Sequence, residues 1–208
     1  MGATLIRRAS VDDLARITEI YNQYIVDSHV SFDTKPWNLE RRREWWELYD
    51  SGDGPWQVWV AEVDGRVVGA SWSSRFRPRT AYDSSVETTI VFDPGVTGRG
   101  LGGRLYEALL DDLDHRGVHR QYAIIALPND ASVALHHRMG YKTQAVQDEV
   151  GHKMGRYWST MLLQRIPPGR EAADRAQGPP GSIGADEASR RRPGAPSEST
   201  FRARPGPV

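Results

Sequence analysis

Helical and strand-like patterns alternate along most of the chain. Ser10 and Asp13 resemble a capping box, and apolar side chains then recur three and four positions apart, which predicts a first helix. Its apolar stripe consists of Val11, Leu14, Ile17, Ile20, Tyr21 and Tyr24. A loop over residues 31–36 leads to a second helix, which begins at Asn38 and ends near residues 51–52.

Strands are predicted where apolar residues alternate or form short runs. Residues 56–62 and 66–74 flank Asp64-Gly65, a two-residue hairpin signal. Residues 122–127 are continuously apolar, which is typical of a strand buried on both faces. The other expected strands cover residues 5–9, 87–92, 141–149 and 157–165. Further helices are expected over residues 101–116 and 131–139, so the element order is β-α-α-β-β-β-α-β-α-β-β.

A glycine-rich turn between the central strand and the helix at residue 101 predicts an anion site. Its glycines are Gly98, Gly100, Gly102 and Gly103. Unpaired N–H groups and the helix dipole favour an anion there, and glycines let the backbone approach it. A triphosphate loop is excluded, because Arg104 and Leu105 follow where Lys and Ser or Thr would be needed. The G-x-G-x-x-G spacing is only a weak match to a dinucleotide turn, because the turn lies mid-chain.

Composition narrows the class of protein. The 208 residues contain no cysteine, which excludes disulfides, thiolate metal sites and a cysteine nucleophile. Lys plus Arg and Asp plus Glu each total 27, so no overall basic field favours nucleic acid. No histidine pair combines metal-ligand spacing, such as four positions apart, with an accompanying carboxylate, and we expect no metal. Without a signal peptide or a run of about eighteen apolar residues, we expect a cytoplasmic protein that does not bind membranes.

The composition changes at Pro167. Eight of the thirteen prolines lie from there to the end, together with only one aromatic residue. Such a segment cannot bury enough apolar surface to offset the entropy lost on ordering. We therefore predict a folded domain over residues 1–166 and a disordered tail over residues 167–208.

Several motifs resemble those of the GNAT acetyltransferases. Residues 97–102 are similar to motif A, R/Q-x-x-G-x-G/A, although Thr97 replaces the usual Gln or Arg. A second motif is similar to motif B of the phosphinothricin and methionine sulfoximine N-acetyltransferase branch; it comprises Leu127, Pro128, Asn129, Asp130, Ser132, Val133, His136, Gly140 and Tyr141. A Phe-x-Thr-x-Pro loop at residues 32–36 and a Gly-x-Lys-x-Gly-x-aromatic segment at residues 151–157 also resemble that branch. The resemblance covers about residues 4–166.

The resemblance implies an α/β (α+β) fold, with a central, mixed, mostly antiparallel twisted sheet of six to seven strands flanked by about four helices. It also implies that acetyl-CoA is the co-substrate and that the protein is a homodimer. The cofactor-binding residues it implies are Ile90, Val91, Phe92, Gly98, Arg99, Gly100, Leu101, Gly102, Gly103, Asn129 and Ser132. Asn129 also has a local interpretation as a helix cap.

Glu87 is the candidate general base. Acetyl transfer needs a neutral amine, whereas an α-amino group is mostly protonated near neutral pH. Glu87 lies at the edge of an apolar strand, where partial burial would raise its pKa. The alternative interpretation is a salt bridge between Glu87 and Arg75 or Arg79.

His136 lies where GNAT enzymes generally place a tyrosine that protonates the leaving thiolate. The resemblance therefore implies that His136 is the acid or that it orients a water. The developing oxyanion should be met by a backbone N–H near Val91 or Phe92.

The acceptor site is the least defined part of the prediction. A carboxylate-bearing acceptor needs a fixed cation. The candidate substrate-binding residues are the cations Arg75, Arg79 and Lys153, with Tyr82, Phe32 and Tyr24 as walls. For each cation, an exposed surface charge is the alternative. Trp158 and Ser159 stand where the branch commonly has an aspartate, which leaves the acceptor itself open.

Together these residues predict an N-acetyltransferase that acts on the α-amino group of a small amino acid or analogue, such as phosphinothricin or methionine sulfoximine. The transfer is expected to be direct, because no cysteine is present to carry the acetyl group. The alternatives are acetylation of another amine, such as an antibiotic or polyamine, and a non-catalytic acyl-CoA-binding module.

Overall fold

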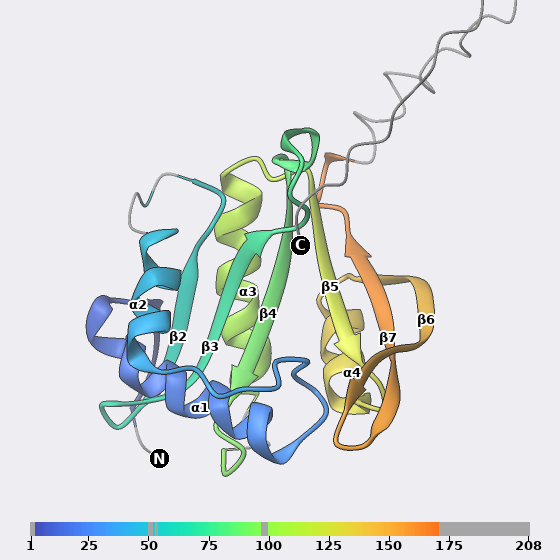
Figure 1. The fold of residues 1–208 in the computed structure, drawn as a ribbon. Coiled ribbons are helices and arrows are strands. Elements are labelled where there is room, and N and C mark those ends of the chain that lie inside the picture. The colour runs from blue at the N-terminus through green and yellow to red at the C-terminus, as the bar shows by residue number, and fades with distance from the viewer. Residues whose placement is uncertain (1–2, 50–51, 53, 97–99, 171–208) are drawn as a thin grey trace, which may run out of the picture. The chain divides into compact units, whose positions relative to one another are not determined.

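The computed structural model describes residues 3–49, 52, 54–96 and 100–170 (Figure 1). Thr97, Gly98 and Arg99 of the predicted turn lie outside this part of the chain, as do residues 171–208 of the predicted tail. The domain boundary at residue 166 therefore stays a prediction.

Seven strands form one sheet in the order β1-β2-β3-β4-β5-β7-β6 (Figure 1). The strands are β1 (Thr4–Arg8), β2 (Val58–Val63), β3 (Arg66–Arg75), β4 (Ser85–Phe92), β5 (Arg120–Ala126), β6 (Lys142–Lys153) and β7 (Arg156–Arg165). Neighbouring strands are antiparallel, except that β4 and β5 are parallel. The predicted mixed, mostly antiparallel sheet is confirmed.

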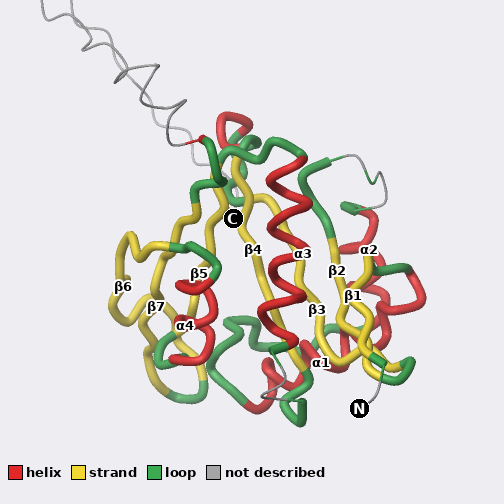
Figure 2. Tube along the Cα trace, turned by 180° about the vertical axis from the view of Figure 1, so that it is seen from behind, coloured by secondary structure: helices red, strands yellow, loops and turns green. Residues whose placement is uncertain are grey.

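Two helices cover each face of the sheet (Figure 2). α1 (Leu14–Asp27) and α2 (Leu39–Glu47) lie on one face, and α3 (Leu101–His115) and α4 (Asp130–Arg138) lie on the other. The predicted capping box is confirmed, because the Ser10 N–H donates to Asp13 Oδ2 at 2.8 Å. Asn38, where the second helix was predicted to begin, caps α2: its side chain accepts from the Arg41 N–H at 2.9 Å. The predicted end of this helix was wrong, because α2 ends at Glu47 and not near residues 51–52.

Each helical layer packs on its own part of the core. The apolar stripe of α3 buries Leu105, Leu109 and Leu113 completely against the sheet. On the other face, Ile17 and Ile20 of α1 are equally buried. Burial of one apolar stripe per helix is what fixes these helices to the sheet.

The two parallel strands separate soon after they meet. β4 and β5 are paired only from Ser85 to Glu87, whereas β4 stays paired with β3 from Val86 to Phe92. Beyond Glu87, β4 and β5 diverge (Figure 1). The prediction that residues 122–127 are buried on both faces is therefore wrong at Ile124, which is 46% exposed. The fold thus opens its sheet at the end of β4 that leads to α3.

Candidate active site

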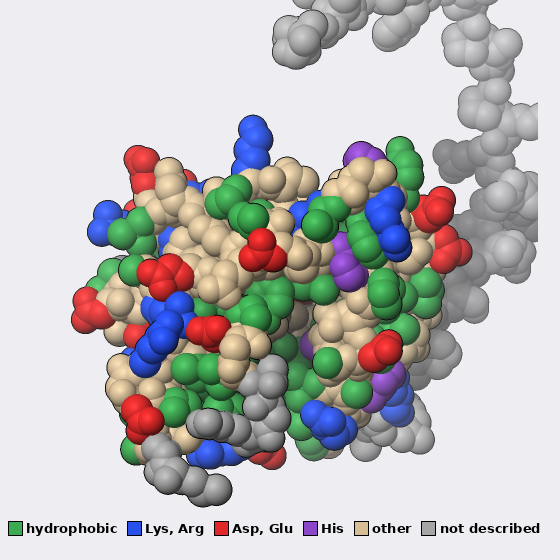
Figure 3. Space-filling model, turned by 90° about the horizontal axis from the view of Figure 1, so that it is seen from below, with side chains coloured by type: hydrophobic (Ala, Val, Ile, Leu, Met, Phe, Trp, Pro, Cys, Tyr) green, Lys and Arg blue, Asp and Glu red, His purple; other side chains and the backbone are tan. Residues whose placement is uncertain are grey.

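A cavity of about 460 Å³ lies where β4 and β5 separate. Its walls come from β4, β5, the start of α4, the end of α1 and the loop after α1. The lining residues that bear on function are Tyr24, Phe32, Glu87, Ile90, Val91, Phe92, Ile124, Asn129, Ser132 and His136. The lower face of the molecule is hollowed near its centre, with hydrophobic side chains around the hollow (Figure 3). Both candidate catalytic residues and five of the eleven predicted cofactor-binding residues therefore line one cavity.

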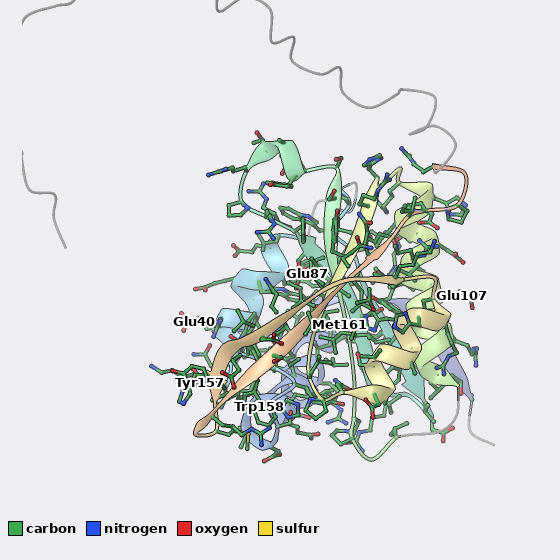
Figure 4. All side chains as sticks on the ribbon, turned by 90° about the vertical axis from the view of Figure 1, so that its right-hand side faces the viewer. Glu40, Glu87, Glu107, Tyr157, Trp158 and Met161 are labelled. Atoms are coloured by element: carbon green, nitrogen blue, oxygen red, sulfur yellow. The ribbon has the colours of Figure 1, made fainter. Side chains whose placement is uncertain are left out.

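The strand register directs Glu87 towards the α1–α2 face. Ser74 of β3 lies directly opposite Glu87, and opposed residues of an antiparallel pair share a face. Trp72 shares that face too, because faces repeat every second residue, and it packs against Tyr21 of α1 and Trp45 of α2. Figure 4 shows Glu87 near the middle of the molecule. The carboxylate therefore lies on the inner side of a helical layer and lines the cavity.

The environment of Glu87 suits a general base. Burial raises the pKa of Glu87 above its usual value, and the nearby Arg77 guanidinium partly offsets this rise. Arg75 instead pairs with Asp83, with 3.6 Å between Nη2 and Oδ1. Within the described residues, no side chain forms an ion pair or hydrogen bond with the Glu87 carboxylate, so the salt-bridge alternative with Arg75 or Arg79 is not found.

The open edge of β4 carries unused backbone groups. The Asp93 N–H donates to the Val68 carbonyl at 2.8 Å, which continues the β3–β4 ladder. Because bonding alternates along an antiparallel strand, Val91 also bonds towards β3, whereas Ile90 and Phe92 point their N–H groups towards the cavity side. The Tyr24 hydroxyl donates to the Phe92 carbonyl at 2.6 Å from that side. Of the two predicted oxyanion donors, the register therefore favours Phe92 over Val91.

The start of α3 lies next to this edge. Gly100 precedes the helix with φ of 67°, a left-handed conformation that glycine adopts without strain. A side-chain carbon added to Gly102 would lie 3.8 Å from the Phe92 ring, which places the first turn of α3 beside the end of β4. No acidic residue occupies that first turn. The N–H groups and dipole of this helix start can therefore hold an anion such as the pyrophosphate of acetyl-CoA.

Asn129 and Ser132 begin α4 on the other side of the opening. The Asn129 side chain accepts a hydrogen bond from the Ser132 N–H at 3.3 Å, which confirms its capping role. Both residues line the cavity. Contact between these two residues and the cofactor stays a prediction.

His136 is held in one orientation by α4. Its Nδ1 lies 2.8 Å from the Ser132 carbonyl oxygen, and a carbonyl only accepts, so Nδ1 carries the proton. The side chain is 3% exposed, and burial lowers the pKa of His136 below its usual 6.5. The ring packs edge-on against Tyr106 and Tyr141, at 5.0 and 5.2 Å between centroids. A neutral ring in this tautomer leaves Nε2 as a hydrogen-bond acceptor, which favours orientation of a water over direct donation of a proton.

A buried group of hydroxyls supports the His136 ring. Thr88 Oγ1 lies 2.7 Å from the hydroxyl of Tyr106 and 2.7 Å from that of Tyr141, and it donates to the Tyr122 carbonyl at 3.0 Å. This group could not be predicted from the sequence, because its members lie on β4, on β5, on α3 and just before β6.

Two of the predicted substrate cations are not in the cavity. Arg75 neighbours Ser74 on β3 and therefore points to the face opposite Glu87, where its guanidinium lies over the Trp56 ring at 5.5 Å. Arg79 is exposed and precedes a single helical turn, Thr80–Tyr82. Neither residue lines the cavity.

Tyr82 does not line the cavity and is connected to it only by the stacked rings of Phe76 and Tyr122. It is 39% exposed and packs edge-on against Phe76, whose ring stacks on Tyr122 at 3.9 Å. Tyr122 lies opposite Glu87 in the β4–β5 pair. Sequence reasoning missed Phe76 and Arg77. Both residues follow Arg75, the last residue of β3, so period-two alternation along the strand could not place them.

Lys153 is also away from the cavity lining. It is 7% exposed, and its Nζ donates to the Ser31 carbonyl at 2.6 Å. Its ammonium group thus binds a backbone carbonyl of the loop after α1. Phe32 of the same loop does line the cavity, as predicted.

A metal site or a membrane-spanning helix among the described residues would indicate a different kind of site. Within this part of the chain, no three His, Asp or Glu side chains lie close enough to hold a metal ion together. Among the helices of residues 3–170 that the structure describes, none is long and apolar enough to cross a membrane.

Comparison with known proteins agrees with this geometry. Residues 17–141 match the acetyltransferase (GNAT) family. A phosphinothricin N-acetyltransferase of Streptomyces coelicolor is 41% identical over 162 residues, which cover 77% of this chain and 94% of that protein. An L-methionine sulfoximine/L-methionine sulfone acetyltransferase of Salmonella typhimurium is 31% identical over 159 residues, which cover 76% of this chain and 92% of that protein.

A solved structure shows the same fold. It is a GNAT superfamily phosphinothricin acetyltransferase from Sinorhizobium meliloti in complex with acetyl-CoA, and it matches with a TM-score of 0.74 at 29% identity. The match covers 79% of this chain and 88% of the other. From the family match, the relatives and the shared fold, we conclude that this chain belongs to the GNAT acetyltransferase family.

Proposed function

We propose that this protein transfers the acetyl group of acetyl-CoA to the α-amino group of a small amino acid or analogue, with phosphinothricin and methionine sulfoximine as the leading candidates. The observation that carries the proposal is Glu87, a carboxylate of raised pKa without an ion-pair partner among the described residues, at the cavity between β4 and β5. The names of the Streptomyces coelicolor and Salmonella typhimurium relatives support the acceptor class.

The residues around the opening fit acetyl-CoA. The N–H groups of Ile90 and Phe92 lie on the open edge of β4, so the Ile90 N–H can pair with an extended amide chain while the Phe92 N–H stays available for the acetyl carbonyl. The start of α3 offers N–H groups to phosphate oxygens. When bound, acetyl-CoA supplies the acetyl group as a thioester. The Phe92 N–H then stabilises the negative charge that develops on the carbonyl oxygen.

Proton transfer is the task of Glu87 and His136. Glu87 accepts a proton from the acceptor ammonium, directly or through a water, and so provides the neutral amine that attacks. His136 holds a water through Nε2, and the second hydrogen of this water forms a hydrogen bond to the departing sulfur, which takes up the proton that the attacking nitrogen loses. Glu87 on β4 thus acts on the acceptor amine, and His136 on α4 acts on the leaving group; both residues line the cavity.

A cation for the acceptor carboxylate comes from Arg77 in this proposal. Arg77 is exposed and near enough to Glu87 to lower its pKa. Its guanidinium also lies over the Phe76 ring, at 4.9 Å from the centroid, which orients it beside the aromatic stack. A carboxylate held there would place the α-amino group of the same small molecule next to Glu87.

Two finer points of the sequence prediction stay predictions. The homodimer is supported by β6, an exposed edge strand with Val146 49% and Val150 55% exposed. The cytoplasmic location is the other.

The test is thiol release from acetyl-CoA across a panel of amines. The panel contains phosphinothricin, methionine sulfoximine, the common amino acids, a polyamine and an aminoglycoside, and product mass confirms each acetylation. Turnover of the two glutamate-like analogues or other small amino acids is expected. Turnover of only the polyamine or aminoglycoside would overturn the acceptor class, and acetyl-CoA binding without any turnover would favour a non-catalytic module.

A further inference from the structure

The loop between α1 and α2 presents Phe32 to the cavity with its backbone fixed on both sides. Before it, the Ser31 carbonyl accepts from Lys153 Nζ at 2.6 Å. After it, Asp33 Oδ2 accepts from the Tyr21 hydroxyl at 2.7 Å and from Trp37 Nε1 at 3.0 Å. The Phe32 ring is therefore carried by an anchored segment, although it is 38% exposed.

Gly151 of β6 leaves room for that ring. A carbon added at Gly151 would lie against Phe32 Cε2 and 2.7 Å from both Cδ2 and Cζ, closer than real side-chain carbons approach. Gly151 is not among the glycines of positive φ, so its backbone would accept another residue without strain. Glycine is needed at this position for space and not for conformation.

Lys153 joins the same strand to the same loop. Its Nζ reaches the Tyr24 carbonyl at 3.4 Å as well as that of Ser31, so one buried ammonium bridges the end of α1 and the loop. Trp158 of β7 reinforces this link: its Nε1 donates to the Lys153 carbonyl at 2.8 Å, and its ring stacks on His29 at 3.8 Å. In Figure 4, Trp158 lies towards the side of Glu40 on α2.

We propose that Gly151 and Lys153 are positioning residues that set the ring of Phe32 as one wall of the acceptor site and so limit the length of the acceptor side chain. Lys153 fixes the backbone beside the ring, and Gly151 fixes how far the ring can lie from the cavity. This inference rests on the proposed function, because it assigns the Phe32 side of the cavity to the amino acid. It also changes the predicted role of Lys153 from contact with substrate to support of the loop.

The first test compares Gly151→Ala with the wild-type protein on amino acids of increasing side-chain length. The new methyl group pushes the ring towards the cavity, so kcat/KM for long acceptors relative to short ones should fall at least tenfold. The KM for acetyl-CoA should stay within twofold. Gly54→Ala is the matched control, because its added carbon meets no atom closer than 4.0 Å.

A double variant separates positioning from general damage. In Phe32→Ala the wall is removed, so longer acceptors should gain relative to short ones. Adding Gly151→Ala to it should then change nothing further, because the methyl group no longer meets a ring. If the two substitutions act additively, or if Gly151→Ala leaves acceptor preference unchanged, the proposal is overturned.

A second measurement needs no acceptor. In Lys153→Met, amide hydrogen exchange over residues 29–36 should rise at least tenfold, while residues 101–115 of α3 stay protected. Lys153→Arg keeps a donor cation and should retain most of the protection. Unchanged exchange in Lys153→Met would refute the role of Lys153 in fixing the loop after α1. Failure of the wild-type protein to acetylate any amino acid would instead refute the proposed function.

Discussion

Replacing Glu87 with glutamine is expected to lower kcat by about 10²- to 10⁴-fold, the usual contribution of a positioned general base. Glutamine keeps the size of the side chain but cannot accept the proton of the acceptor ammonium. The Kd of acetyl-CoA should change by less than about twofold, because the residues that would hold it lie further along β4 and on α3. Steady-state kinetics and calorimetry measure the two quantities separately.

The pH dependence of kcat/KM also tests the role of Glu87. Burial raises the pKa of Glu87, and the carboxylate is the active form. The kcat/KM of the wild-type protein for its acceptor should therefore rise as pH rises through that raised pKa, and this acidic limb should be absent in Glu87→Gln.

A control variant removes a carboxylate that does not line the cavity. Glu107→Gln lies on α3 at the outer side of the molecule, remote from Glu87 (Figure 4). It should keep both the rate and the acidic limb. Turnover by Glu87→Gln within about threefold of wild type near neutral pH would remove Glu87 from the mechanism.

Replacing His136 with phenylalanine is expected to lower kcat by about 10- to 100-fold. This is the range that follows from losing one hydrogen bond to a developing charge, about 1.5–3 kcal/mol. Phenylalanine keeps an aromatic ring edge-on to Tyr106 and Tyr141, so the fold should be retained. The loss should appear in kcat and not in the KM for acetyl-CoA.

The pH dependence separates His136 from Glu87. Because burial lowers the pKa of His136, the ring is neutral above its usual pKa of 6.5 and gains a proton only at lower pH. His136→Phe should therefore keep the limb that Glu87 produces. His115→Phe, at the exposed end of α3, is the control. A kcat for His136→Phe equal to that of wild type would exclude a role for the imidazole.

The fold was predictable because its signals are local. Asp64 and Gly65 both have positive φ, at 51° and 77°, as a two-residue hairpin turn requires. The leucine spacing of α3 and its end near Gly117 are equally local, since each depends on residues within one or two turns. The wrong boundary of α2 shows the limit of such signals, because the periodic residues after Glu47 continue without a helix.

The site was predictable where one strand or one helix carries it. Glu87, Asn129 and His136 line one cavity because β4 and α4 flank the same opening. Arg75 was misplaced because a shift of one position along a strand reverses the face of a side chain, and only the pairing of Ser74 with Glu87 fixes that phase.

Lys153 lies outside the cavity lining for another reason. The strand that carries it was expected to end at residue 149, but β6 continues to Lys153 through an irregularity between Gln147 and Gly151. No local sequence pattern predicts that a lysine at the end of a mostly exposed strand is buried. Its partners, Ser31 and Tyr24, are more than a hundred residues away in the sequence, so only the fold brings them together.

The most direct test of the central claim is a crystal structure of the protein with acetyl-CoA and an amino acid acceptor, using Glu87→Gln to slow turnover. The account predicts that a pantetheine amide pairs with the open edge of β4 at Ile90. The acetyl carbonyl oxygen should lie within hydrogen-bond distance of the Phe92 N–H, and the α-amino nitrogen should face residue 87. Acetyl-CoA bound away from the gap between β4 and β5, or an amine on the Arg75 face of the sheet, would contradict it.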